Sequence, residues 1–269
     1  MSELTDRSNP PAPVGPPGSV APVGPATPRP GWELLLVLGV SLAASAANSI
    51  LRFVNLLTRD VPLNQQTTSM NTVTPDRVWL DLAYQVTNAV FLPIPALLAL
   101  YLLWRAREHA AIGLDWSRPG RDLGWGALVA AAIGIPGLGL YLVARELGFN
   151  TNVAPGSLGL GALTAVVLVA LAAGNGLLEE VVMVAFFFSR ARALNWHPWV
   201  FVTASALIRG TYHLYQGPGA MAGNFVMGVA FGLFYLKTKR VMPLVVAHTL
   251  LDVVAFVGYP LLAPYLAWL

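Results

Sequence analysis

Seven long apolar segments dominate this chain, and each is close to the length that an α-helix needs to cross a bilayer. Such a helix takes about 20 mostly apolar residues. The segments are 33–54, 80–104, 123–145, 160–188, 198–215, 219–237 and 241–258. A shorter piece, 259–269, is either an eighth span or a continuation of the seventh that is kinked at Pro260. Only 11% of the residues are charged, against about 25% in soluble domains. The sequence therefore predicts an all-α fold, a polytopic transmembrane helical bundle of about 7–8 spans.

Residues 1–31 differ from the rest of the chain because they are rich in proline and glycine and show no apolar periodicity. This composition predicts a disordered, partly extended tail, and the tail lacks the apolar core of a signal peptide. We therefore divide the chain into a disordered cytoplasmic tail, 1–31, and a transmembrane helical domain, 32–269. Within the spans, Pro93, Pro95 and Pro136 predict kinks rather than breaks, since neighbouring helices can satisfy the freed carbonyls.

The positive charges lie in alternate connecting loops. Lys and Arg gather between spans two and three, four and five, and six and seven, whereas loops 146–159 and 216–218 have none. The positive-inside rule places the basic loops and the N-terminus in the cytoplasm. The longer loop 55–79, which carries Arg59 and Arg77, would lie outside. We expect an integral membrane protein of a bacterial plasma membrane. No concentrated basic face is visible, so no nucleic-acid partner is expected. The absence of cysteine excludes disulfides and thiolate metal sites.

Few ionisable residues fall at depth within the predicted spans, away from their ends. They are Glu179 and Glu180 in the fourth span, Arg209 and His213 in the fifth, and His248 and Asp252 in the seventh. A carboxylate at the bilayer centre costs about 2.5–3.5 kcal/mol even on the most lenient insertion scale, and adjacent carboxylates repel each other. Such groups indicate an enclosed polar cavity in which something is bound, moved or cut.

The spacing of these residues puts pairs of polar side chains on shared helix faces. Residues four apart lie on one face of a helix. The pairs with this spacing are Asn175 with Glu179, Arg209 with His213, and His248 with Asp252. Left unpaired, these groups would cost roughly 10 kcal/mol, so we expect the three faces to meet. A carboxylate base, two imidazoles and an orienting carboxylate suffice to activate water. Each element alone also fits a structural role, since an intramembrane histidine often hydrogen-bonds to a neighbouring helix.

Three short motifs in this region resemble those of a known family. Gly176–Val184 contains Glu-Glu and resembles a first motif of the form Glu-Glu-x-x-x-Arg. Arg209–Gln216 resembles a second motif, Phe-x-x-x-His, and His248–Asp252 resembles a third, His-x-x-x-Asn or Asp. In this order the motifs are typical of the CPBP intramembrane proteases, the CAAX protease and bacteriocin-processing family, also called Abi. The core that resembles the family covers about residues 160–258.

The resemblance implies an all-helical membrane core with a catalytic cavity, and it implies hydrolysis of a peptide bond. By position, Glu179 would be the general base and Glu180 would support it. His213 and His248 would position water and bind the developing oxyanion. Asp252 would take the Asn or Asp place of the third motif.

The chain departs from the family pattern at two positions. Val184 stands where the first motif has arginine, and Arg209 stands where the second has phenylalanine. We infer that Arg209, on a neighbouring helix, supplies the guanidinium that Glu180 would otherwise lack, with Asn175 as a further supporting residue. The opposing interpretation is that Arg209 extends to the membrane interface and catalysis is impaired.

The same residues raise the question of a metal. Two histidines with carboxylates could hold Zn²⁺, through Glu179, His213 and His248. No His-Glu-x-x-His pair is present, and adjacent residues on a helix point about 100° apart, which predicts poor ligand geometry for the two glutamates. We therefore favour a mechanism without a metal or other cofactor.

Three functions remain open at the level of sequence. The favoured one is an intramembrane endopeptidase that hydrolyses a peptide bond of a membrane-associated protein or peptide by glutamate-activated water. A non-catalytic family member, acting as a binding or immunity membrane protein, is an alternative that the two departures allow. A proton-coupled carrier is another, since buried Glu and His also form proton relays, although no internal repeat is evident. The expected partners are a membrane protein or peptide substrate and the lipid bilayer.

Overall fold

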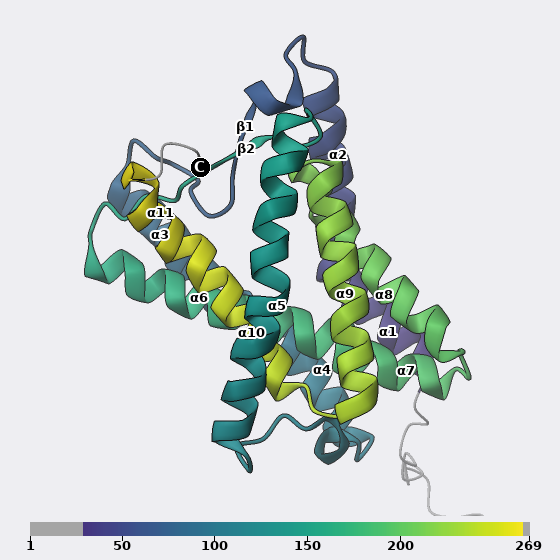
Figure 1. Ribbon diagram of the computed structural model, residues 1–269. Coiled ribbons are helices and arrows are strands. Elements are labelled where there is room, and N and C mark those ends of the chain that lie inside the picture. The colour runs from purple at the N-terminus through teal and green to yellow at the C-terminus, as the bar shows by residue number, and fades with distance from the viewer. Residues whose placement is uncertain (1–28, 266–269) are drawn as a thin grey trace, which may run out of the picture.

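A computed structural model describes residues 29–265, and within them the protein is a bundle of helices (Figure 1). The predicted tail, 1–31, lies almost entirely outside the described residues. The α-helices are α1 Pro30–Gly39, α2 Leu42–Leu57, α3 Val78–Phe91, α4 Ile94–Arg105, α5 Pro119–Glu146, α6 Ala162–Glu180, α7 Phe187–Ala193, α8 Pro198–Tyr212, α9 Pro218–Thr238, α10 Met242–Val253 and α11 Tyr259–Leu262. The predicted all-α membrane bundle is confirmed.

Within residues 29–265, five helical segments are long and apolar enough to cross a membrane. They are Val78–Arg105, Pro119–Glu146, Ala162–Ala193, Pro218–Thr238 and Met242–Tyr265. A sixth results if α1 and α2, bent by 45° at their junction, form one span. The predicted span at 198–215 is instead the 15-residue α8, which is shorter than a full crossing requires. The residues from 259 continue the seventh predicted span and do not form an eighth. The short α8 and this continuation together explain why there are fewer spans than the 7–8 predicted.

The prolines within the spans do not end them, as predicted. The segment 78–105 is one membrane-length unit in which α3 ends at Phe91 and α4 begins at Ile94, next to Pro93. Helix α5 runs without interruption through Pro136. Proline removes a backbone donor without ending these spans.

The connecting loops gather at two ends of the bundle. At one end the loops after α2 and α5 meet through two short parallel strands, β1 Thr67–Ser69 and β2 Asn152–Ala154. At the other end the loop after α4 meets the α9–α10 connection, where the Val241 N–H donates to the Ile112 carbonyl at 2.9 Å. The two strands are absent from the sequence prediction. The placement of these four connections agrees with the predicted order of spans.

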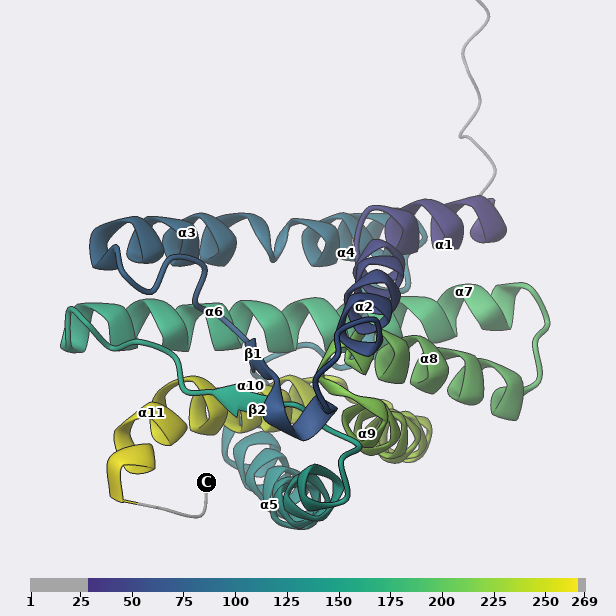
Figure 2. The same ribbon diagram turned by 90° about the horizontal axis from the view of Figure 1, so that it is seen from above.

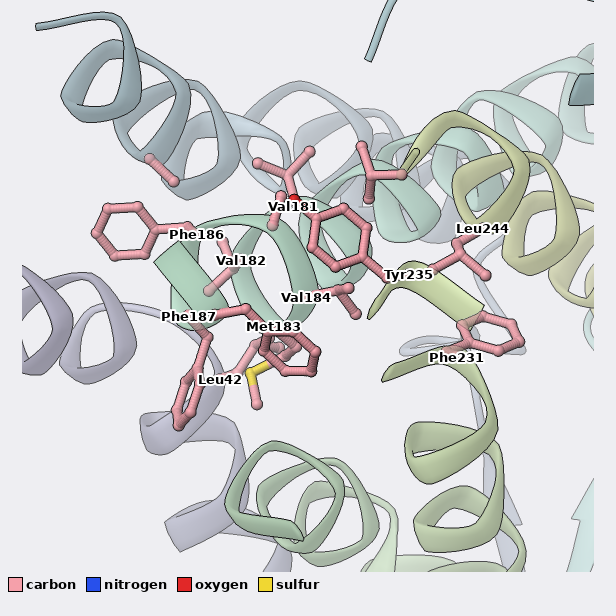
Figure 3. Close-up of a cluster of buried hydrophobic side chains, with 14 of the residues drawn as sticks. Leu42, Val181, Val182, Met183, Val184, Phe186, Phe187, Phe231, Tyr235 and Leu244 are labelled. Atoms are coloured by element: carbon pink, nitrogen blue, oxygen red, sulfur yellow. The ribbon is translucent and has the colours of Figure 1, made fainter. Parts of the chain in front are cut away.

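Helices α6 and α7 form the centre of the molecule. Figure 2 shows them running across it between α3 and α4 on one side and α10 on the other. Side chains are buried on every face of the stretch Val181–Phe188 (Figure 3). A helix that is apolar all round belongs in an interior rather than against lipid. The Glu179–Glu180 pair directly precedes this fully enclosed stretch.

Two π-helical segments follow polar motifs in the chain. Val181–Phe186 comes directly after Glu179 and Glu180, and Val254–Gly258 comes shortly after Asp252. In the first segment the Met183 carbonyl accepts a hydrogen bond from the Ser205 hydroxyl at 2.7 Å. A π-helical turn contains more residues than an α-helical turn, so it changes which faces the flanking residues present, and such turns are frequent at functional sites.

A glycine allows α6 and α10 to approach closely just before the glutamates. A Cβ atom on Gly176 would lie 2.8 Å from the Thr249 Oγ1 atom and 3.0 Å from the Val245 carbonyl oxygen. Any larger side chain would push the helices apart, and small residues serve this purpose in membrane helix packing. The close approach brings the end of α6 within reach of His248 on α10.

Candidate functional site

Three helices bring the predicted polar residues together in the interior. Glu179 and Glu180 end α6, Arg209 lies in the last turn of α8, and His248 lies on α10. Glu180 and Arg209 are 0% exposed, and Glu179 and His248 are 3% exposed. The expectation that these faces meet, drawn from the cost of unpaired charges in a membrane, is therefore met by these four residues.

Glu180 is held from two sides. Its Oε1 atom lies 2.7 Å from the Arg209 Nη2 atom and 2.6 Å from the His248 Nδ1 atom. The Arg209 Nη1 atom also lies 3.4 Å from the same imidazole nitrogen. Hydrogen bonds between charged groups are stronger than neutral ones, so this three-way contact fixes α6, α8 and α10 relative to one another.

Glu179 faces the same guanidinium from a second position. Its Oε2 atom lies 3.4 Å from Arg209 Nη1 and 3.9 Å from His248 Nε2. The same oxygen accepts a hydrogen bond from the Tyr212 hydroxyl. Among the described residues, none donates a hydrogen bond to the other oxygen, Oε1. Oε2 is thus held in place by its partners, whereas Oε1 remains able to accept a hydrogen bond.

Asp252 and Asn175 form the edge of the cluster. The Asn175 amide donates to the Asp252 Oδ2 atom at 2.7 Å, and that oxygen lies 3.7 Å from His248 Nε2. Asn175 thus contacts the third motif rather than Glu179, with which it shares a helix face. This pair limits how the His248 ring can turn.

His213 lies beside the cluster without joining its hydrogen bonds. It follows the last residue of α8, and its ring is 4.9 Å from the ring of Tyr212. Its Nε2 atom is buried and has no hydrogen-bond partner among the described residues. A buried polar atom without a partner is costly and needs an explanation, and a substrate or water group is one.

The contact predicted for Arg209 is present. Its guanidinium bonds Glu180 across the helix interface, while Val184 is a buried apolar residue in the π-helical segment. The Arg209 Cζ atom also lies 5.5 Å from the centroid of the Phe231 ring, and such cation–π contacts stabilise a desolvated guanidinium. The interpretation in which Arg209 extends to the interface is therefore wrong.

Sequence reasoning missed Tyr212 and Phe231. Tyr212 stands three residues after Arg209, so the same helix-face rule that paired Arg209 with His213 could have found it. Phe231, on α9, contacts both Arg209 and His248 through its ring. Nothing in the sequence around Phe231 distinguishes it from other apolar residues in a membrane helix.

The two adjacent glutamates share a site, contrary to the expectation from their positions on a helix. Glu179, Glu180 and His248 each offer a ligand atom, and these atoms lie within 4.8 Å of one another. Glutamate side chains are long enough to turn toward one partner although their Cβ atoms diverge. His213 is not part of this set, so the predicted metal set of Glu179, His213 and His248 is not assembled.

The donor set does not fit a divalent metal as it is arranged. The Arg209 guanidinium already contacts both carboxylates, and the His248 Nδ1 atom already contacts Glu180. A divalent cation would have to displace a buried positive charge and separate these pairs.

Comparison with known families agrees with the three motifs. Residues 161–254 match the family described as Type II CAAX prenyl endopeptidase Rce1-like. The match contains all of the clustered residues and supports the assignment of this helical core to the CAAX protease family. Comparison with curated proteins and with solved structures gives no match. The family assignment supports a protease rather than a carrier or a non-catalytic binder.

Replacing Arg209 tests the cluster through stability. We expect Arg209→Gln to lower the free energy of unfolding by about 3–5 kcal/mol, because it leaves two buried carboxylates without their cation. Thermal unfolding of the purified protein in detergent measures the loss. The matched control Arg105→Gln, at an exposed arginine, should change stability by about 0.5 kcal/mol or less.

A second substitution tests whether the loss of stability comes from the unpaired carboxylates or from the changed shape of the side chain at position 209. Adding Glu180→Gln to Arg209→Gln should recover part of the loss, because one uncompensated carboxylate is then removed. If Arg209→Gln unfolded at the wild-type temperature, the guanidinium would not be holding the glutamates in the folded protein.

Proposed function

We propose that this protein is an intramembrane endopeptidase in which Glu179 activates a water molecule without a metal ion. The observation that carries the proposal is the buried cluster in which Arg209 contacts both Glu179 and Glu180 beside His248. The family match to a prenyl endopeptidase supports proteolysis as the reaction class. The substrate we propose is a membrane-associated protein or peptide, presented to the cluster from within the bilayer.

Glu179 is the better candidate for the base. Glu180 uses its Oε1 atom to bind both Arg209 and His248, so its task is to hold those groups in place. Glu179 is anchored through Oε2 by Tyr212 and Arg209, and its Oε1 atom accepts no hydrogen bond from a described residue. A general base needs an oriented oxygen within hydrogen-bond reach of the water that it deprotonates.

The imidazoles have complementary tasks in this proposal. His248 is fixed at Nδ1 by Glu180, which leaves Nε2 facing Glu179 and Asp252. His213 contributes a buried Nε2 atom without a partner among the described residues. Both nitrogens are suited to orient water or to donate to an oxyanion, a role in which preorganised donors have large effects.

The proposed reaction needs only water, the peptide bond and the Glu179 carboxylate. Glu179 takes a proton from water as the water oxygen bonds to the peptide carbonyl carbon, and the carbonyl oxygen becomes an oxyanion next to the histidines. The C–N bond then breaks. The proton returns from Glu179 to the leaving amine, which regenerates the carboxylate and releases a new carboxyl and a new amino terminus.

We also propose that the loops near Ala110 face the cytoplasm, with the N-terminus, in a bacterial plasma membrane. The asymmetry of Lys and Arg between the two ends supports this orientation. Because the chain has no cysteine, single cysteines report their side directly. Asp76→Cys should react with an impermeant maleimide on intact cells, and Ala110→Cys only after permeabilisation. The reverse labelling would contradict the orientation.

Replacing the proposed base should abolish cleavage. Membranes from cells that express wild-type protein should contain new peptide termini that are lost with Glu179→Gln, since a general base contributes about 10²–10⁴-fold to rate. Quantitative mass spectrometry of protein termini measures this. The matched control is Glu146→Gln, the same change at a glutamate whose side chain is 76% exposed, which should keep the wild-type pattern. Identical termini in wild type and Glu179→Gln would overturn the proposed catalysis.

Chelation distinguishes a metal-independent mechanism from one that needs Zn²⁺. We expect cleavage in isolated membranes to continue after exhaustive treatment with EDTA and 1,10-phenanthroline, because Arg209 supplies the positive charge of the site. The appearance of the Glu179-dependent termini is the measurement. Loss of cleavage that Zn²⁺ alone restores would refute the metal-independent mechanism and favour a metal site.

A further inference from the structure

A second polar site lies at the end of the bundle where α5 begins and α9 ends. It is a pocket of about 430 Å³ between these helices and the start of α10. Four basic residues line it, together with two aromatic ones: Arg118, Arg121, Lys237, Arg240, Trp125 and Phe234. The clustered catalytic candidates lie on α6, α8 and α10 and do not line this pocket, so the two sites are separate.

The basic residues of the pocket divide into one that is neutralised and three that are not. Arg240 lies 2.6 Å from Asp122 and 3.0 Å from Asp115. Hydrogen bonds from Arg240 hold the pKa of Asp115 below its ordinary value, as expected for a carboxylate beside a guanidinium. Arg118, Arg121 and Lys237 are exposed and form no ion pair with any described residue. The pocket therefore carries an excess of unneutralised positive charge.

The aromatic residues give the pocket an apolar wall. The rings of Trp125 and Phe234 pack edge to face with centroids 6.0 Å apart, and Trp125 is 43% exposed. Tryptophan prefers the interface between hydrocarbon and headgroups. Beyond Trp125 the outer face of α5 exposes Leu128 and Ile135, along which an acyl chain could lie.

From this arrangement we infer that the pocket binds the phosphate of an anionic phospholipid. Three free cations would attract the phosphate, and the adjoining exposed face of α5 would contact the chains of the same molecule. Basic pockets between membrane helices are suited to acidic headgroups. A free phosphate ion would use the cations alone and would leave the apolar wall without a role, which favours the lipid.

Lipid competition on the purified, full-length protein tests this inference. Native mass spectrometry in detergent would measure the binding of phosphatidylglycerol and of phosphatidylcholine to wild type, to Arg121→Gln with Lys237→Gln, and to a control with Arg105→Gln and Arg107→Gln. The control removes the same charge from exposed arginines at the same end of the bundle, outside the pocket. Thermal unfolding would verify that all three proteins are folded.

We expect the pocket variant to bind phosphatidylglycerol on the order of tenfold more weakly than wild type, with phosphatidylcholine unchanged and the control within about twofold. An equal loss in the control would show a non-specific surface effect and overturn the inference. So would unchanged binding in the pocket variant. Displacement of the lipid by inorganic phosphate or glycerol 1-phosphate at similar concentrations would identify a free-phosphate site instead, and would also overturn it.

Discussion

The contact of one buried guanidinium with two adjacent carboxylates is the interaction on which the membrane core depends. Arg209 bonds Glu180 at 2.7 Å and lies 3.4 Å from Glu179, and all three side chains are almost completely enclosed. An isolated charge in this interior would cost several kcal/mol. Helices α6 and α8 must therefore keep the position in which these charges meet, and His248 adds α10 to the same contact.

Features of the backbone make that meeting possible. Gly176 lets α10 approach α6 closely, so that His248 reaches the end of α6. The π-helical segment 181–186 follows the glutamates directly, and its fully buried apolar side chains hold α6 in the centre of the bundle. The charged cluster thus lies in a closely packed frame, the kind of support that a catalytic site would require.

Much of the fold and the main residues of the site could be predicted from the sequence, because hydropathy and helical spacing determine both. The cost of burying charge predicted that the faces bearing Glu179, Arg209 and His248 would meet. Other features had no such signal. The π-helical segments, the short α8 and the β1–β2 pair depend on tertiary packing. The expected divergence of Glu179 and Glu180 was wrong, because their side chains turn toward a shared partner on another helix.

The different roles that we propose for the two glutamates rest on what each side chain contacts. Each glutamate keeps one oxygen without a described donor, but Glu180 lies 2.7 Å from Arg209 and 2.6 Å from His248, whereas Glu179 lies 3.4 Å and 3.9 Å from them. The most direct measurement is therefore the cleavage rate of Glu179→Gln beside that of Glu180→Gln, with a substrate identified from its wild-type termini. The account predicts that Glu179→Gln abolishes cleavage while Glu180→Gln slows it and leaves measurable turnover. Cleavage by Glu179→Gln together with its complete loss in Glu180→Gln would contradict it.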